Sequence, residues 1–169
     1  TTRRQRQMCI RDRSYGSYKE TRKAKTNYKW EKLELVAKAA QNLKEYYNAD
    51  NLIMIGHSGG ALTSATINSR VPKLIDKSIL ISCPCDFEKW RKMRGESVYK
   101  MKTSPHKNIS GISKDSHTII IVGKNDINTF PILSKKYHEI LISKGFKSEL
   151  HIIEGEHSSS SLVDLSKII

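Results

Sequence analysis

Blocks of apolar residues alternate along this chain with amphipathic segments, in an order that predicts strands and helices in turn. The continuous apolar run from Leu52 to Ile55 is typical of a strand buried on both faces, and strands are predicted at 51–55, 77–82, 117–122 and 148–153. Apolar residues at three- and four-residue steps are typical of helices packed on a sheet, and helices are predicted over about 28–47, 58–69, 130–144 and 159–168. Gly145 is expected to end the third helix. Alternating elements of this kind predict an α/β fold, with a parallel sheet and helices on both of its faces.

The first strand leads into Gly56-His57-Ser58-Gly59-Gly60, a Gly-x-Ser-x-Gly pattern followed by the small residues of a helix. A strand, a tight turn and a helix are the context that a nucleophile elbow requires. We expect Gly56 and Gly60 to be needed because a Cβ two residues either side of the serine would collide with neighbouring backbone. Ser58 would then stand at the carboxyl edge of the sheet, with the N–H of Gly59 facing an oxyanion. His57 is expected to be a packed side chain.

An activated serine needs a base, and the base needs a carboxylate that orients it. Asp126 follows the strand at 117–122, and His157 follows the strand at 148–153. Both positions lie at the edge of an open α/β sheet where sites assemble, in the chain order serine, acid, histidine. Asp86, after the strand at 77–82, is a competing acid. Asp126 is preferred because it follows directly on Gly123-Lys124-Asn125 and has a free loop around it.

On these residues the chain resembles, over 14–169, the C-terminal part of an α/β-hydrolase catalytic domain. Tyr15-Gly16-Ser17-Tyr18, the Val-Gly-x-Asn-Asp turn and the Glu-Gly-x-His end make it most similar to the prolyl-oligopeptidase and dienelactone-hydrolase-like branch. The resemblance implies Ser58 as nucleophile, His157 as general base and acid, and Asp126 as the residue that orients His157.

The same resemblance implies a serine hydrolase that cleaves an ester or a peptide bond, without a metal ion or an organic cofactor. Two alternatives stay open: a non-catalytic binding module with the same fold, and an inactive fragment. The segment 86–113 is predicted to be a lid-like insertion with one or two short helices. The loop that supplies the second oxyanion donor in this fold is expected to lie upstream of the given sequence.

Residues 1–13 differ in composition from the rest, since 3–13 hold five of the nine arginines of a chain that otherwise prefers lysine. This string resembles the translation of a sequencing adapter, so we expect it to be non-native and the natural protein to begin further upstream. The partial catalytic domain is then 14–169.

The formal net charge is +13, but the lysine-rich stretches at 19–32 and 89–107 do not interleave aromatic with basic residues. They predict a solvated surface rather than a nucleic-acid partner. No run of eighteen apolar residues exists, so no membrane span is expected, and the sequence predicts a soluble protein whose compartment it does not reveal. Cys83-Pro84-Cys85 is interpreted as small residues after a strand, too close together for a disulfide and too sparse for a zinc site.

Overall fold

The computed structural model describes residues 28–98 and 104–157. In chain order its elements are α2 (Trp30–Tyr46), β1 (Ile53–His57), α3 (Gly59–Arg70), β2 (Lys77–Ile81), α4 (Phe87–Met93), the 3₁₀ helices η1 (Pro105–Lys107) and η2 (Ile109–Gly111), β3 (His117–Gly123), α5 (Pro131–Ser143) and β4 (Lys147–Ile153). The four predicted strands and three of the predicted helices are therefore present, with ends that shift by one or two residues. The helix predicted over 159–168 lies outside the described residues.

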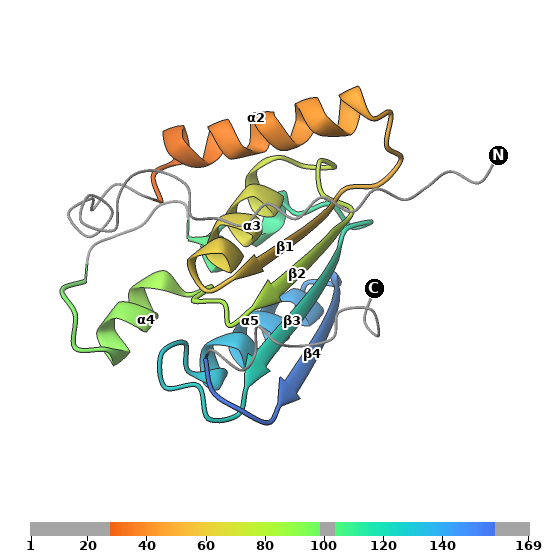
Figure 1. Cartoon of the computed structure of the whole chain (residues 1–169). Coiled ribbons are helices and arrows are strands. Elements are labelled where there is room, and N and C mark those ends of the chain that lie inside the picture. The colour runs from red at the N-terminus through yellow and green to blue at the C-terminus, as the bar shows by residue number, and fades with distance from the viewer. Residues whose placement is uncertain (1–27, 99–103, 158–169) are drawn as a thin grey trace.

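The four strands form one parallel sheet in the order β1-β2-β3-β4 (Figure 1). Ile55 lies opposite Ile79, and Ile79 lies opposite Ile119, so branched apolar side chains meet across the middle of the sheet. The inner strands β2 and β3 are buried almost throughout, whereas β4 alternates between half-buried and exposed positions. The predicted parallel sheet is confirmed.

The described helices with the largest sheet contacts lie on one face of the sheet. Ala61 and Ala65 of α3 share a buried cluster with Tyr137 and Leu141 of α5 and with Leu80 of β2. Right-handed crossovers that always step toward the same edge place every connecting helix on the same side. The sequence predicts helices on both faces; α3 and α5 lie on one of them, and the helix predicted over 159–168 lies outside the described residues.

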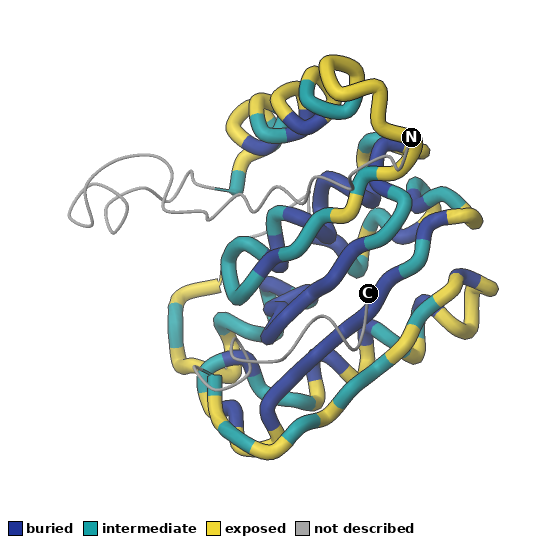
Figure 2. The backbone as a smooth tube through the Cα atoms, turned by 45° about the vertical axis from the view of Figure 1, so that its right-hand side comes forward, coloured by how far each residue is buried: buried dark blue, intermediate teal, exposed yellow. Residues whose placement is uncertain are grey.

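The opposite face of the sheet carries a second buried cluster. Helix α2 packs beside α3, on the same side of the sheet as the first cluster. Ile79, Ile81, Ile119 and Ile121 make up the second cluster and are buried. Figure 2 shows the central strands coloured as buried along most of their length. In α2, Leu33 and Ala37 are buried against Ile67 of α3, as its apolar spacing predicted. None of the described helices is long and apolar enough to cross a membrane.

Proline and glycine lie at the two ends of α5, and Gly145 ends the helix as the sequence predicted. Pro131 occupies the first turn, where a missing N–H costs nothing. Gly145 has φ 73° just beyond the last turn, a conformation that glycine adopts without strain. The insertion between β2 and β3 holds α4, η1 and η2, so short helices do form there, while 99–103 lie outside the described residues.

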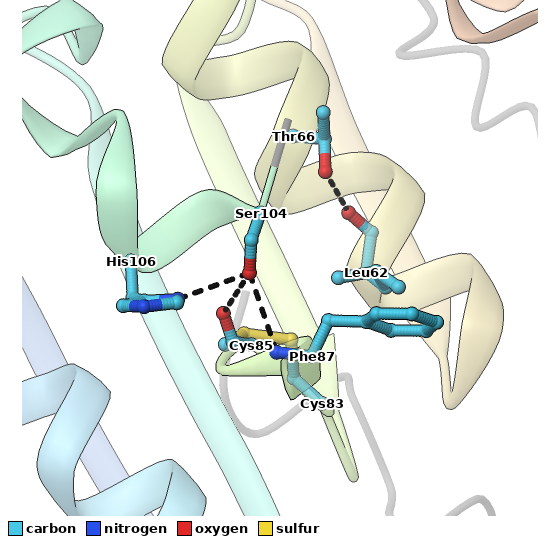
Figure 3. The surroundings of a disulfide bond; sticks show 7 residues. All are labelled: Leu62, Thr66, Cys83, Cys85, Phe87, Ser104 and His106. Atoms are coloured by element: carbon cyan, nitrogen blue, oxygen red, sulfur yellow. Dashed lines mark hydrogen bonds between the residues drawn. A yellow bond between two sulfur atoms is a disulfide. The ribbon is translucent and has the colours of Figure 1, made fainter. Parts of the chain in front are cut away.

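Cys83 and Cys85 form a disulfide, which the sequence analysis had wrongly excluded (Figure 3). The turn around Pro84 holds their Cα atoms 5.2 Å apart, a separation that a disulfide spans readily. Sequence separation was therefore a poor guide to distance. The Cys85 carbonyl also accepts hydrogen bonds from the His106 N–H at 3.3 Å and the Ser104 hydroxyl at 3.5 Å. These hydrogen bonds join the segment after β2 to the start of η1.

The disulfide is testable by peptide mapping. Trypsin cleavage after Lys77 and Lys89 releases a peptide that contains both cysteines. Alkylation of the denatured, unreduced protein should leave this peptide unmodified, and prior reduction should add two alkyl groups to it. Closing so short a loop stabilises the fold by only about 1.5 kcal/mol in the chain-entropy treatment, so reductant should lower the free energy of unfolding by about that amount. Alkylation without prior reduction would contradict the bond.

Candidate functional site

The three residues that the sequence singled out follow three different strands of the sheet. Ser58 follows β1, Asp126 follows β3 and His157 follows β4. Because all strands are parallel, their carboxyl ends lie at the same edge. Figure 1 shows the four strand arrows pointing the same way, so positions 58, 126 and 157, which follow three of them, lie at one edge of the sheet.

Ser58 has φ 54° and ψ −115°, a backbone conformation that is rare outside glycine. Such a residue costs about 1–3 kcal/mol and persists only where its surroundings hold it. The Ser58 N–H donates to the Ile81 carbonyl at 2.8 Å, and the Ser58 carbonyl accepts from the Leu62 N–H at 3.1 Å. Hydrogen bonds to β2 and to α3 thus fix the turn from both sides. Gly59 is the first residue of α3, so its N–H has no partner within the helix.

The two outer glycines of the motif differ in what they permit. A Cβ on Gly56 would overlap the Gly60 carbonyl group and lie 2.6 Å from the Ala61 nitrogen, so the predicted steric need is confirmed there. A Cβ on Gly60 would meet nothing within 4 Å, so the same prediction is wrong for Gly60. Gly60 already lies in the first turn of α3, where a Cβ has room.

A matched pair of alanine substitutions tests this difference. Gly56→Ala should lower the free energy of unfolding by about 3 kcal/mol, since the backbone must move to admit the methyl group. Gly60→Ala should raise it by up to about 1 kcal/mol, because alanine is the better helix former. Urea denaturation of both variants measures the two values. Equal destabilisation by the two substitutions would contradict the geometry of the turn.

Asp126 and His157 form the central contact of the site. The His157 Nδ1 lies 2.9 Å from Asp126 Oδ2, with the Asp126 side chain fully buried and the His157 side chain 21% exposed. A carboxylate accepts hydrogen bonds but does not donate them, so Nδ1 carries a proton.

The Asp126 carboxylate has further donors. Asp126 Oδ1 accepts the Asn128 N–H at 2.9 Å and the Thr129 N–H at 2.8 Å, and Oδ2 accepts the Thr129 hydroxyl at 2.7 Å. Burial by itself would raise the pKa of Asp126, but hydrogen bonds from His157, Thr129 and Ser82 outweigh burial and hold that pKa well below its ordinary value. Asp126 is therefore ionised at neutral pH.

His57 links the serine turn to the loop that carries His157. The His57 Nε2 donates to the His157 carbonyl at 3.0 Å, and the two imidazole rings lie 4.7 Å apart. The sequence predicted a packed histidine at this position. The side chain does pack, but its hydrogen bond also ties the residue beside Ser58 to the backbone of His157.

Gly123 permits the close approach of the loop after β4. A Cβ on Gly123 would lie 2.6 Å from the Gly155 carbonyl oxygen and 2.8 Å from that of Glu156. The Asn125 N–H donates to the Gly155 carbonyl at 3.0 Å. The absent side chain thus allows the backbone just before His157 to lie against the turn that carries Asp126.

The competing acid, Asp86, serves a different part of the structure. Its carboxylate caps α4 by accepting the Lys89 N–H at 3.0 Å, and it lies 3.8 Å from Nε2 of His106. Nearby, His106 Nδ1 lies 3.0 Å from the Ser104 hydroxyl (Figure 3). Asp126, rather than Asp86, is the acid that contacts His157.

The other histidines have partners away from this edge. His117 and His151 lie 3.0 Å and 3.2 Å from carboxylate oxygens of Glu149, and His138 lies 2.9 Å from the Ser148 hydroxyl. Within the part of the chain that the structure describes, no group of three or more His, Cys, Asp and Glu side chains is arranged to hold a metal ion. An open cavity borders the insertion, lined by residues of α4 with Asp86, Val98 and His106.

Sequence reasoning missed two residues whose side chains contact Asp126. These residues are Thr129 and Ser82. A signal existed for Thr129, because an aspartate commonly accepts backbone N–H groups two and three residues further on and so forms a turn. No comparable signal pointed to Ser82, which lies 44 positions from the acid and reaches it only because β2 and β3 are neighbours.

The lowered pKa of Asp126 predicts how stability depends on pH. An aspartate whose pKa is lower in the folded than in the unfolded chain stabilises the fold at pH values above its ordinary pKa of 3.8. That stabilisation is lost as the pH falls toward the pKa of the folded chain. Between pH 6 and pH 3 this loss should be about 1 kcal/mol. Asp126→Asn should remove that component, measured by urea denaturation at both pH values. The matched control, Asp115→Asn at an exposed position, should keep it, and an unchanged pH dependence in Asp126→Asn would contradict the assignment.

No family model and no curated protein matches the sequence. Solved structures do match the fold. Dipeptidyl peptidase 4 of Porphyromonas gingivalis superimposes with a TM-score of 0.61 at 18% identity, over 75% of this chain and 19% of that one. Esterase PE8 superimposes with a TM-score of 0.58 at 20% identity, over 82% of this chain and 61% of that one. An acylaminoacyl peptidase of Pyrococcus horikoshii gives 0.62 at 12% identity, over 78% and 24%.

These similarities establish the fold, which is that of the α/β-hydrolases. The chain spans less than two thirds of the length of each of these three proteins.

Proposed function

We propose that this chain with the α/β-hydrolase fold carries the catalytic residues of a serine hydrolase that cleaves an ester or a peptide bond through an acyl-enzyme. The observation that carries the proposal is the buried Asp126–His157 hydrogen bond of 2.9 Å at the sheet edge where the strained Ser58 turn lies. Peptidases and esterases are named among the proteins of similar structure, which supports hydrolysis as the reaction class.

In this proposal Ser58 is the nucleophile and His157 is the general base. His157 Nδ1 is protonated toward Asp126, so the lone pair of Nε2 is available to take the proton of the Ser58 hydroxyl. The Ser58 oxygen attacks the substrate carbonyl carbon, and His157 then returns the proton to the leaving group. A water molecule, deprotonated by His157, hydrolyses the acyl-enzyme and regenerates Ser58.

Asp126 orients the imidazole and stabilises the imidazolium that forms. It performs this role as an anion, which its hydrogen bonds favour. The developing oxyanion is held by the Gly59 N–H at the N-terminus of α3, where backbone donors and the helix dipole both favour negative charge. A second oxyanion donor is assigned to no described residue.

The strain at Ser58 supports the same role. A serine with positive φ on a turn between a strand and a helix has its hydroxyl exposed above the sheet edge. Strained backbone of this kind occurs most often at active sites, where it holds a reacting side chain in position.

Labelling with a fluorophosphonate probe tests the proposal directly. The 169-residue chain should form a covalent adduct that peptide mapping places on Ser58, and Ser58→Ala should abolish it. Hydrolysis of a short p-nitrophenyl ester should fall at least about 10³-fold in Ser58→Ala. Comparing that ester with a peptide p-nitroanilide then distinguishes an esterase from a peptidase.

A matched control is Ser64→Ala. Ser64 lies in the same helix that follows the turn, and its buried hydroxyl has no hydrogen-bond partner among the described residues. This variant should label and turn over like the parent chain. A correctly folded chain that does not react at Ser58 would contradict the proposal and favour a non-catalytic binding module.

A further inference from the structure

The buried carboxylate of Asp126 has more donors than a catalytic histidine alone provides. Five hydrogen bonds reach it: the N–H groups of Asn128 and Thr129, the hydroxyl groups of Thr129 and Ser82, and Nδ1 of His157. Its two oxygens offer about four lone-pair sites, so the carboxylate is saturated. Four of the five donors come from residues with no part in proton transfer to the substrate.

Thr129 contacts both members of the acid–base pair. Its hydroxyl oxygen lies 2.7 Å from Asp126 Oδ2 and 3.1 Å from His157 Nδ1, while Nδ1 and Oδ2 are 2.9 Å apart. The hydroxyl has one proton, which it donates to Oδ2, so its lone pair faces the Nδ1–H. The imidazole N–H therefore has two acceptors, and turning the ring over would lose both.

Ser82 approaches Asp126 from the neighbouring strand end. It is fully buried, has φ 50°, and its N–H donates to the Ile121 carbonyl at 2.8 Å. Its hydroxyl donates to the Asp126 carboxylate. The disulfide between Cys83 and Cys85 follows directly and fixes the backbone that presents this hydroxyl.

We propose that Thr129 and Ser82 are positioning residues that hold the Asp126 carboxylate in the orientation in which it fixes His157, with Thr129 acting on both. This inference rests on the proposed function, since it assigns Thr129 and Ser82 a role in the same reaction. The two hydroxyls approach from different strand ends, so together they restrain both rotation and displacement of the carboxylate. The Thr129 methyl group has no part in this role.

Substitutions of similar size separate the hydroxyl from packing. Thr129 is fully buried, so Thr129→Val removes the hydroxyl at nearly constant volume, and Thr129→Ser keeps the hydroxyl without the methyl group. With a p-nitrophenyl ester, Thr129→Val should lower kcat about 10- to 100-fold with little change in KM, and Thr129→Ser should remain within a few-fold of the parent. Ser82→Ala should also lower kcat.

The pH profile gives a readout that a packing role would not change. Losing a donor to the charged carboxylate raises the pKa of Asp126, so in the pH profile of unfolding stability the Asp126-dependent loss should begin at higher pH in Thr129→Val. Among the groups that lower the pKa of Asp126, His157 is the titratable one. In an Asp126→Asn background, Thr129→Val should have almost no further effect, because both changes act through the same carboxylate.

The proposal fails if Thr129→Val has the kcat and pH profile of the parent, or if Thr129→Ser is as impaired as Thr129→Val. It also fails if Thr129→Val still lowers kcat in the Asp126→Asn background. Acid unfolding separates this failure from that of the proposed function, since it requires no turnover. If Thr129 holds the carboxylate, Thr129→Val should lose part of the Asp126-dependent stability difference between pH 6 and pH 3. If the parent chain is inactive but Thr129→Val shows this loss of stability difference, only the hydrolase proposal is overturned. If the stability difference between pH 6 and pH 3 is unchanged in Thr129→Val, the role of Thr129 is overturned.

Discussion

The site depends on keeping one carboxylate charged in the interior of the protein. Burying an ionised aspartate is costly unless hydrogen bonds replace the water that it loses. Asp126 is fully buried, and its donors come from the end of β2, from its own turn after β3 and from the loop after β4. Those three segments must stay together for the charge to be tolerated. The hydrogen bonds that stabilise the buried charge also determine which nitrogen of His157 carries the proton.

Close backbone approach is the second requirement, and glycine meets it at two places. Gly56 lets the end of β1 lie against the first turn of α3, and Gly123 lets the loop before His157 lie against the turn of Asp126. His57 connects these two regions by a hydrogen bond from beside Ser58 to the His157 backbone. The three segments that hold positions 58, 126 and 157 are thus joined by backbone contacts as well as by side chains.

Much of this arrangement followed from the sequence because it depends on short-range patterns. Apolar runs located the four strands, and Gly145 marked the end of α5. Parallel strands then require the residues after them to share an edge, which is why the sequence predicts Asp126 and His157 as partners. The errors arose where contacts between distant segments decide the outcome. Open space beside Gly60 and the geometry of the Cys83–Cys85 turn were of this kind.

By itself, then, the sequence determined the order of strands and helices, the parallel sheet and the positions of Ser58, Asp126 and His157 at its carboxyl edge. These depend on hydrophobic periodicity, on glycine and proline, and on chain order, all of which can be read within a few residues. Only the tertiary structure decided which groups surround the buried carboxylate. Ser82 reaches Asp126 because β2 pairs with β3, and the Thr129 hydroxyl meets His157 because the loop after β4 folds onto the turn after β3. Such contacts join residues far apart in the chain, and their cost or benefit depends on burial, which no local pattern specifies.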